Sequence, residues 1–234
     1  MTEPAVRICD LRFAWPGQAA ACLDIAEFTV ARGESVFVHG ESGSGKSTLL
    51  ALLGGVLVPQ AGSVNVLGTE LTRLSAGSRD RFRVDHTGFI FQQFNLIPYL
   101  SMQDNVLLPC RFSERRRQRA LQRSATLADE ARRLLAELDL DPSLWRRPVT
   151  QLSVGQQQRV AAARALIGEP ELVIADEPTS ALDAARQAAF LDLLARECAQ
   201  AGATLIFVSH DSRLASHCSR AVALADLQRA AAPA

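Results

Sequence analysis

The chain has 234 residues, and its 25 lysines and arginines balance its 25 aspartates and glutamates. This length fits one α/β domain with a full hydrophobic core, and the balanced charge gives no indication of a nucleic-acid partner. The longest stretch of only apolar residues and glycine, Leu49–Val58, is much shorter than the roughly 18 residues that cross a bilayer. The N-terminus has no signal pattern and the five cysteines are scattered, so we expect a cytoplasmic protein with free thiols.

Short β-type runs alternate with turns in the first third of the chain. A Gly-rich turn after the run Ser35–His39 leads into an apolar stretch, which predicts a strand–loop–helix unit with its helix over Ser47–Leu53. The predicted strands of this region are Val6–Phe13, Phe28–Val30, Ser35–His39, Val64–Leu67 and Phe89–Phe91.

The middle of the chain, from about Tyr99 to Ile167, lacks strand signals and is expected to be helical. Pro98, and Pro109 beyond it, break the preceding pattern of strands. Over Ser124–Leu138 the apolar residues fall on one helical face, and they are Leu127, Ala131, Leu134, Leu135 and Leu138.

Strand signals return at Leu172–Ala175 and Thr204–Val208, and the run Ala221–Ala225 is also strand-like. This alternation of β-type runs with a helical middle predicts a mostly parallel sheet that carries a helical insertion. The Ala-rich end, Ala230–Ala234, is expected to fray.

A phosphate-binding loop is predicted at Gly40–Ser47, which fits G-x-x-x-x-G-K-[ST] at every fixed position between a strand and a helix. Gly43 and Gly45 let the backbone curl so that successive N–H groups point at phosphate oxygens, and the following helix adds its positive dipole end. We expect Lys46 to reach the β- and γ-phosphates and the Ser47 hydroxyl to coordinate Mg²⁺. The alternative is a glycine-rich turn that binds nothing. The loop alone leaves open whether phosphate passes to water or to another acceptor.

Two adjacent carboxylates, Asp176 and Glu177, follow the apolar run that starts at Leu172. They are costly at the end of a buried strand unless something compensates their charge. We expect Asp176 to hold Mg²⁺ and Glu177 to take a proton from an attacking water. A solvated acidic turn is the structural alternative, and a small-molecule kinase would orient an acceptor hydroxyl with the same groups.

The segment LSVGQQQR, Leu152–Arg159, places Ser153 and Gln156 in the S-x-x-Q spacing of a capping box. It predicts a helix from about Val154 to Ile167 whose N-terminus suits an anion. Capping alone would also explain the serine. Because the phosphate loop already surrounds one side of the nucleotide, we expect this helix end to face the γ-phosphate bound by another subunit.

Taken with ADEPTSALD at Ala175–Asp183 and SHD at Ser209–Asp211, these motifs stand in the order found in ATP-binding cassette (ABC) transporter ATPases. Nearly the whole chain resembles that family. The resemblance implies an α/β fold: a P-loop NTPase (RecA-like) core with a mostly parallel sheet, an N-terminal antiparallel β subdomain and an α-helical subdomain. It also implies ATP and Mg²⁺ as cofactors, and hydrolysis of ATP to ADP and phosphate coupled to transmembrane transport.

The domain division that the resemblance implies is a single ABC ATPase domain over residues 1–234. Its RecA-like core would comprise about 1–95 and 168–234. The helical subdomain would comprise about 96–167.

By the same resemblance, Glu177 would polarise the attacking water, with His210 and Gln92 helping to position it. His210 would be the switch histidine near the γ-phosphate, and Gln92 in FIFQQ would also sense the membrane partner. The metal ligands would be Ser47, Gln92 and Asp176.

Trp15 in FAWPG matches the aromatic residue that stacks on adenine, with Phe13 as the competing candidate. Asp183 would belong to the loop that couples the two sites of a head-to-tail dimer. The implied ATP-binding residues are Trp15, Gly40, Glu41, Ser42, Gly43, Ser44, Gly45, Lys46, Ser47, Thr48, Ser153, Gly155 and Gln156.

The family usually has glycine where this chain has Val154. With Ser153 as the N-cap, Val154 is the first helical residue, where φ is negative and valine is allowed. We therefore expect Gly155 to permit the close approach to the nucleotide and Val154 to leave the site competent.

The stretch Arg81–Pro109 resembles a subgroup that contains macrolide-efflux (MacB), lipoprotein-release (LolD) and cell-division (FtsE) ATPases. In those systems, closure of an ATP-bound dimer moves an integral-membrane permease. The resemblance implies a permease partner, a second copy of this chain, and a peripheral place at the inner face of the cell membrane. The alternative is an FtsE-like regulatory ATPase that acts through a membrane partner without transporting a substrate.

The basic run Arg111–Arg123 is expected to form a solvated helical face. Contact with lipid headgroups or with a permease loop is its functional alternative.

Two other classes of function remain open from the residues. A P-loop kinase would pass phosphate to a small acceptor, but the Ser153 helix and His210 argue against it. A soluble relative acting on DNA or ribosomes would usually carry coiled coils, zinc modules or two cassettes, and none is visible here.

Overall fold

A five-stranded parallel sheet forms the centre of the molecule, in the computed structural model that describes residues 3–18, 20–180 and 182–229. Its spatial order is β6-β7-β8-β3-β9, and every neighbouring pair is parallel. Both faces of the sheet are covered, which explains why its inner strands are continuous apolar runs. The strands are β3 (Ser35–His39), β6 (Thr87–Ile90), β7 (Leu172–Asp176), β8 (Thr204–Ser209) and β9 (Arg220–Ala223).

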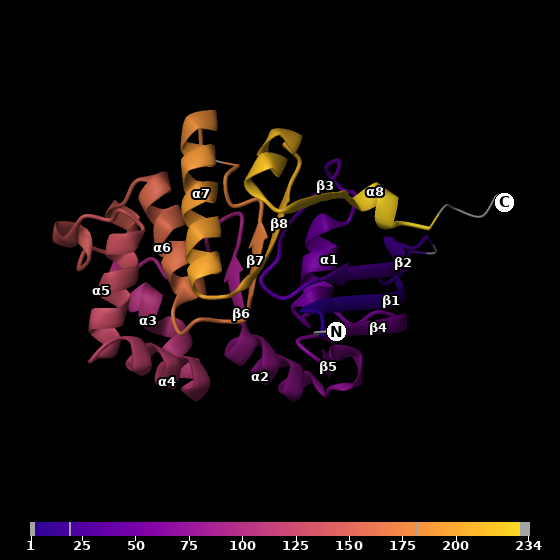
Figure 1. Ribbon diagram of the computed structural model, residues 1–234, viewed down its shortest axis with the longest axis horizontal. Helices are drawn as coiled ribbons and strands as arrows, with labels where there is room; N and C mark the ends of the chain where they lie inside the picture. Colours follow the sequence, from indigo (N-terminus) through magenta and orange to yellow (C-terminus); the bar gives the residue numbers. More distant parts are fainter. Residues whose placement is uncertain (1–2, 19, 181, 230–234) are drawn as a thin grey trace.

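A second sheet, of four antiparallel strands, lies at one end of the molecule (Figure 1). Its order is β2-β1-β4-β5. Along β1, buried and more exposed residues largely alternate, as expected of a strand with one covered face. The strands are β1 (Val6–Phe13), β2 (Leu23–Val30), β4 (Ala61–Val66) and β5 (Thr69–Glu70).

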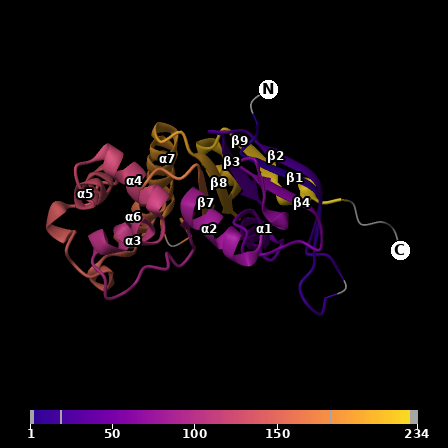
Figure 2. The ribbon, with the colours of Figure 1, turned by 90° about the horizontal axis from the view of Figure 1, so that it is seen from below.

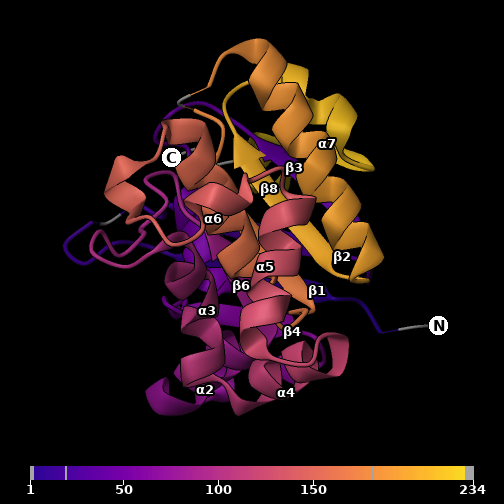
Figure 3. The same cartoon turned by 90° about the vertical axis from the view of Figure 1, so that its left-hand side faces the viewer.

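Four consecutive helices, α3 to α6, gather at the opposite end, and this order along the molecule is the same in Figures 1 and 2. Figure 3 looks onto that helical end, with the four helices in front of the parallel strands. The α-helices are α1 (Lys46–Leu53), α2 (Ala76–His86), α3 (Met102–Phe112), α4 (Glu114–Arg123), α5 (Leu127–Glu137), α6 (Val154–Leu166), α7 (Ala184–Gln200) and α8 (Leu224–Leu227). Short 3₁₀ turns lie at Leu71–Arg73, Pro142–Leu144, Val149–Gln151 and Ser212–His217.

Two hydrophobic cores meet at the parallel sheet. On β7, Leu172 and Ile174 pack with α1 and the antiparallel sheet, whereas Val173 and Ala175 pack with the helical end. Successive side chains of a strand point to opposite faces, so each core takes every second residue. The strand that ends at Asp176 is thereby held from both sides.

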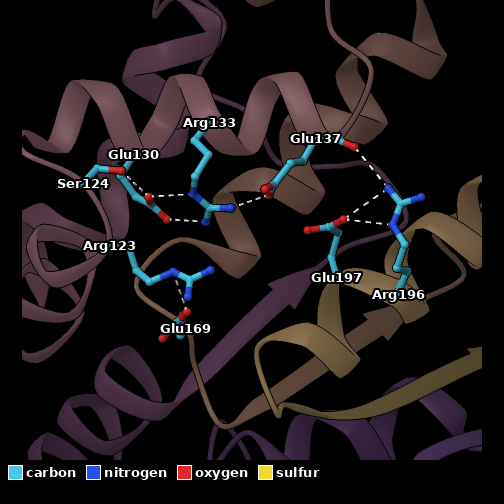
Figure 4. A network of polar contacts seen from close by, with 8 residues as sticks. All are labelled: Arg123, Ser124, Glu130, Arg133, Glu137, Glu169, Arg196 and Glu197. Carbon is cyan, nitrogen blue, oxygen red and sulfur yellow. Dashed lines mark hydrogen bonds and ion pairs between the residues drawn. The ribbon is translucent and has the colours of Figure 1, made fainter.

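A network of polar contacts runs from α5 of the helical end to α7 (Figure 4). On α5, Arg133 donates to the buried Glu130 at 2.6 Å and to Glu137 at 2.5 Å. Arg196 of α7 pairs with Glu197 at 3.2 Å and donates to the Glu137 carbonyl at 3.5 Å. Burial and the neighbouring Glu137 carboxylate raise the pKa of Glu197.

The structure confirms the predicted architecture and several elements. The strands at Val6–Phe13 and Ser35–His39 agree at both ends, and the helix beginning at Val154 is confirmed. The core and helical boundaries at 95 and 168 stay a prediction. The predicted frayed end, Ala230–Ala234, lies outside the described residues.

Other element predictions were wrong or incomplete. Pro109 does not end the helical pattern: it lies inside α3, which continues for three residues to Phe112. The run Ala221–Ala225 is strand only to Ala223, where α8 begins to turn the chain. Helices α2 and α7 were not predicted.

The expectation of a solvated face is wrong for part of the basic run. Arg116 is buried, and its guanidinium donates to the carbonyls of Ile167 at 2.8 Å and Ala165 at 2.6 Å. Arg115 and Arg119 both pair with Glu171, at 2.5 and 2.8 Å. Burial raises the pKa of Glu171, but hydrogen bonds with His86 and Arg115 outweigh it and bring the value down to about 2.

Within the described ranges, no helix combines the length and the apolar character that a membrane span requires.

Candidate functional site

The phosphate loop lies between the end of β3 and the start of α1, as the sequence predicted. Gly45 is the N-cap of α1 with φ of 103°, and Gly43 has φ of 78°. These are conformations that residues with a Cβ rarely adopt. They orient the loop for phosphate binding by its N–H groups at the positive end of the α1 dipole.

Lys46 projects back over this loop from the first position of α1. Its ammonium is nearly buried and donates to the carbonyls of Gly40 at 2.8 Å and Glu41 at 2.9 Å. The hydroxyl of Ser44 is buried in the same loop and has no hydrogen-bond partner among the described residues. An unpaired buried hydroxyl is costly, so the loop fits a ligand that offers acceptor oxygens.

Glu177 joins the phosphate loop to the end of β8. Its Oε1 lies 3.8 Å from Lys46 Nζ, and its Oε2 lies 3.1 Å from His210 Nδ1. Its backbone is left-handed, with φ of 42°, and its N–H donates to the Val208 carbonyl at 3.0 Å. That conformation costs a non-glycine residue on the order of 1–2 kcal/mol, which is the kind of strain found at functional sites.

Asp176, the last residue of β7, lies beside Ser47. Burial raises the pKa of the Asp176 carboxyl above its ordinary value, while a hydrogen bond with Ser47 opposes that shift. The negative charge of Glu177 also raises the pKa of Asp176. A cation next to Asp176 would favour its ionised form.

The parallel register explains why these groups meet. Asp176 is paired with Val208, and His39 with Ser209, so β3, β7 and β8 end at one edge of the sheet. Beside them, Ile90 of β6 pairs with Ala175. Ligands of open α/β sheets bind at the carboxyl ends of the strands.

A hollow of about 390 Å³ lies at this edge. It brings together residues from five separate segments of the chain. Its lining residues are Trp15, Cys22, Ser42, Gly43, Gly45, Lys46, Ser47, Thr48, Gln92 and Glu177.

Trp15, rather than Phe13, lines this nucleotide-sized hollow. Trp15 is 41 % exposed, whereas Phe13 is buried and packs edge-on against it with ring centroids 5.2 Å apart. Gln92 lies in the exposed turn after β6 and lines the same hollow.

The oxygen ligands expected for Mg²⁺ come together here. Ser47 lies beside Asp176, and Gln92 lines the same hollow as Ser47. The described part of the chain contains no group of three or more His, Cys, Asp or Glu residues suited to a metal ion. A single carboxylate with hydroxyl and amide oxygens fits Mg²⁺, which is usually bound through one or two carboxylates together with substrate phosphates.

The LSVGQQQR segment starts α6 with the predicted capping box. Gln156 N–H donates to the Ser153 hydroxyl at 3.3 Å, and Ser153 N–H donates to the Gln156 side chain at 2.9 Å. Val154 is the first helical residue and is 46 % exposed. A Cβ added to Gly155 would meet only Leu182 Cδ2, at 3.9 Å. The fold of this chain therefore has room for a larger residue at that position.

This helix end opens into a different hollow, of about 560 Å³, which Ser153, Val154, Gly155 and Gln156 help to line. Among the described residues, it shares no lining residue with the phosphate-loop hollow. Asp183, the predicted coupling residue, is exposed and caps α7 by accepting from Arg186 N–H at 3.0 Å.

Cys22 was not predicted at the site. It precedes β2, lines the phosphate-loop hollow and donates to the Thr48 hydroxyl at 3.7 Å. No motif marks it, because its place depends on the packing of β2 against α1 rather than on local sequence.

The sequence pattern of the family described as "ABC transporter" matches residues 23–180. The "Uncharacterized ABC transporter ATP-binding protein YbbA" of Escherichia coli (strain K12) is 42 % identical, over 86 % of this chain and 85 % of that protein. The "Macrolide export ATP-binding/permease protein MacB 1" of Aeromonas hydrophila subsp. hydrophila is also 42 % identical, over 97 % of this chain. The chain spans about a third of that relative, at 34 % of its length.

Solved structures agree with these relatives. The ATP-binding cassette MJ0796, in a dimeric post-hydrolysis state bound to ADP and Pi, is 33 % identical with a TM-score of 0.78, over 95 % of this chain and 94 % of that one. The cbiO1 protein of Clostridium perfringens, described as part of the ABC transporter complex cbiONQ, is 25 % identical with a TM-score of 0.79, over 95 % of this chain and 85 % of that one.

Proposed function

The chain belongs to the ABC transporter family of ATP-binding, ATP-hydrolysing cassettes, and from that premise we propose that it powers a membrane permease with the residues described above. One observation carries the assignment of residues. Glu177 lies between the phosphate-loop lysine, 3.8 Å away, and His210, 3.1 Å away. A carboxylate in that position can accept a proton next to a bound γ-phosphate.

In the proposed reaction, a water oxygen bonds to the γ-phosphorus while the bond from phosphorus to the β–γ bridging oxygen breaks. Glu177 accepts the proton that the water loses. His210 orients the Glu177 carboxylate through their hydrogen bond, and Gln92, which lines the same hollow, helps to position the water. Lys46 donates to the phosphate oxygens, and Trp15 stacks on adenine.

Mg²⁺ held by Ser47, Asp176 and Gln92 would neutralise charge on the phosphate oxygens. Ser47 and Asp176 already lie side by side, so one cation can contact both. Burial raises the pKa of Asp176 because it makes the ionised carboxylate costly. A cation beside Asp176 would offset that cost.

A second copy of the chain completes the site in this proposal. The N-terminus of α6 carries a free positive dipole end, and it opens into a hollow separate from its own phosphate loop. In a head-to-tail dimer, Ser153, Gly155 and Gln156 reach the ATP bound by the other copy. Asp183 lies on the connection between the two sites.

Replacing Lys46 with alanine tests the nucleotide site. We expect ATP binding to weaken by about two orders of magnitude, because hydrogen bonds to charged groups contribute about 1.5–3 kcal/mol each. Calorimetric titration with ATP measures the dissociation constant, and phosphate release without any acceptor other than water measures turnover and excludes a kinase. Arg73→Ala is the control, since the Arg73 side chain is 82 % exposed and its ion pair is with the nearby Glu70. Unchanged affinity in Lys46→Ala would refute the assignment.

The proposed docking site for the permease is an apolar groove of about 320 Å³ beside the Gln92 turn. Its walls include Val56, Phe91 and Phe112, which are 58 %, 39 % and 67 % exposed. Large exposed apolar side chains gathered in one hollow are typical of a protein interface. Through this contact the chain would sit at the cytoplasmic face of the membrane.

The groove is tested by Phe112→Asp in cells that express the chain with its own permease. We expect the membrane-bound fraction to fall at least about tenfold, because an aromatic anchor commonly contributes 2 kcal/mol or more to an interface. Quantitative blotting of washed membranes is the measurement. Tyr99→Asp is the matched control, because Tyr99 is 80 % exposed but does not line the groove. Equal loss in both variants would contradict this docking site.

A further inference from the structure

The turn that carries Gln92 continues into an unusual backbone. Phe94 has φ of 58° and Asn95 has φ of 47°. In the described part of the chain they are the only adjacent pair of non-glycine residues with positive φ. Asparagine tolerates this conformation, but phenylalanine does so poorly, so neighbouring contacts must hold it.

Arg164 provides that contact from the last turn of α6. Its Nη2 donates to the Phe94 carbonyl at 2.5 Å, and its Nη1 donates to the Asn95 carbonyl at 2.7 Å. A guanidinium presents its N–H groups in a rigid plane, so the two bonds fix both carbonyls together. Burial lowers the pKa of Arg164.

The residues after this pair are fixed by a different side chain. Asn105 of α3 is fully buried; it accepts from Ile97 N–H at 2.8 Å and donates to the Ile97 carbonyl at 3.1 Å. The far side of the turn is thus attached to α3. Among the side-chain hydrogen bonds that the described residues make to this turn, those of Arg164 lie nearest to Gln92, because Phe94 follows Gln92 by two residues.

The helix that holds Arg164 begins at the Ser153 capping box. One rigid helix therefore carries the ATP-facing N-terminus at one end and the contact to the Gln92 turn at the other. Arg164 also lines the apolar groove, together with Phe91 and Asn95.

We propose that Arg164 is a positioning residue for ATP hydrolysis, which fixes Gln92 relative to α6 by holding the Phe94 and Asn95 carbonyls. It does not touch the nucleotide and acts through Gln92. The inference rests on the proposed function, because it assumes that Gln92 serves the hydrolytic site.

The test is a double-mutant cycle in the full chain. We expect Arg164→Met to lower kcat about tenfold, within the range by which mutations in coupling networks act, while KM for ATP changes by less than about twofold. Gln92→Ala should lower kcat by at least as much. If Arg164 acts through Gln92, the double variant should equal Gln92→Ala within about twofold, because effects that share one route do not add.

Arg159→Met is the matched control. Arg159 also lies on α6 and donates to two backbone carbonyls, those of Leu138 at 3.3 Å and Asp139 at 3.2 Å, but these residues directly follow α5. Any loss that this variant causes should multiply with the loss of Gln92→Ala. If instead the losses of kcat in Arg164→Met and Gln92→Ala multiply in the double variant, the inference is overturned.

Hydrogen–deuterium exchange provides a readout that needs no turnover. The amides of residues 93–97 should exchange about tenfold faster in Arg164→Met. Their exchange rates should be unchanged in Arg159→Met. Arg164→Lys keeps the positive charge and can keep one of the two hydrogen bonds, so it should recover part of kcat and part of the protection from exchange. This variant keeps the inference testable if Arg164→Met folds poorly. Absence of phosphate release by the unmodified chain would reject the proposed function, whereas normal release with unchanged exchange in Arg164→Met would reject only the role of Arg164.

Discussion

Glu177→Gln should bind ATP and remain locked in a nucleotide-bound dimer, with turnover reduced about 10²–10⁴-fold, the usual loss when a general base is removed. Glutamine preserves the size of the side chain but cannot accept the proton of the attacking water. The glutamine amide can still hydrogen-bond to His210, so it can replace the carboxylate in the 3.1 Å contact with that side chain. The dimer should accumulate because hydrolysis, which opens it, is blocked.

Phosphate release measures the turnover of this variant, and light scattering with and without ATP·Mg²⁺ measures dimer formation. Glu114→Gln is the control, because Glu114 is exposed on α4, where its carboxylate contacts Arg117 and Gln118 of the same helix. Near-normal hydrolysis by Glu177→Gln would reject Glu177 as the base. Lost ATP binding would instead show that its main role is electrostatic support of Lys46.

Gly155→Val should abolish ATP-dependent dimerisation and lower turnover by two orders of magnitude or more, a barrier increase of about 3 kcal/mol. The fold itself should tolerate the valine, because the nearest neighbour of an added Cβ is Leu182 at 3.9 Å. Thermal unfolding should therefore change little. Val154→Gly should keep most of the turnover and cost at most about 1 kcal/mol of stability through helix propensity. Equal losses of turnover in the two variants would contradict the role given to Gly155.

Mixing two inactive variants shows whether the α6 N-terminus serves the ATP site of its own chain or that of the other chain. A head-to-tail dimer of Lys46→Ala with Gly155→Val has one site with both lesions and one site with neither. Phosphate release should therefore recover on mixing. If each chain used its own α6 N-terminus, every site would carry a lesion and no recovery would occur.

How much of this could be predicted from the sequence depended on the range of the interactions. The phosphate loop and the Ser153 capping box are local, and both lie where the sequence placed them. Helix α2 gave no signal because it has no buried residue and so no apolar stripe. Helix α7 did carry a usable signal, with Phe190, Leu194 and Cys198 four residues apart and all buried.

The long-range contacts could not have been predicted. Arg116 resembles its basic neighbours in sequence, yet it is buried against carbonyls about fifty residues away. Arg164 and the Phe94 carbonyl are separated by 70 residues. Nor does any local pattern mark Phe94 for a left-handed conformation, since it is the tertiary contact that holds it there.

Lys46 is the only lysine of this chain, since its 25 basic residues otherwise comprise 24 arginines. Unlike a guanidinium, an amine becomes nucleophilic once it loses its proton. Apart from the α-amino group, Lys46 is thus the one amine of this chain that acylating reagents, aldehyde dyes and cellular acetylation can modify. Its ammonium is nearly buried over the phosphate loop. Every lysine adduct would be an adduct at the phosphate loop, so the extent of labelling at Lys46 itself becomes a gauge of nucleotide occupancy.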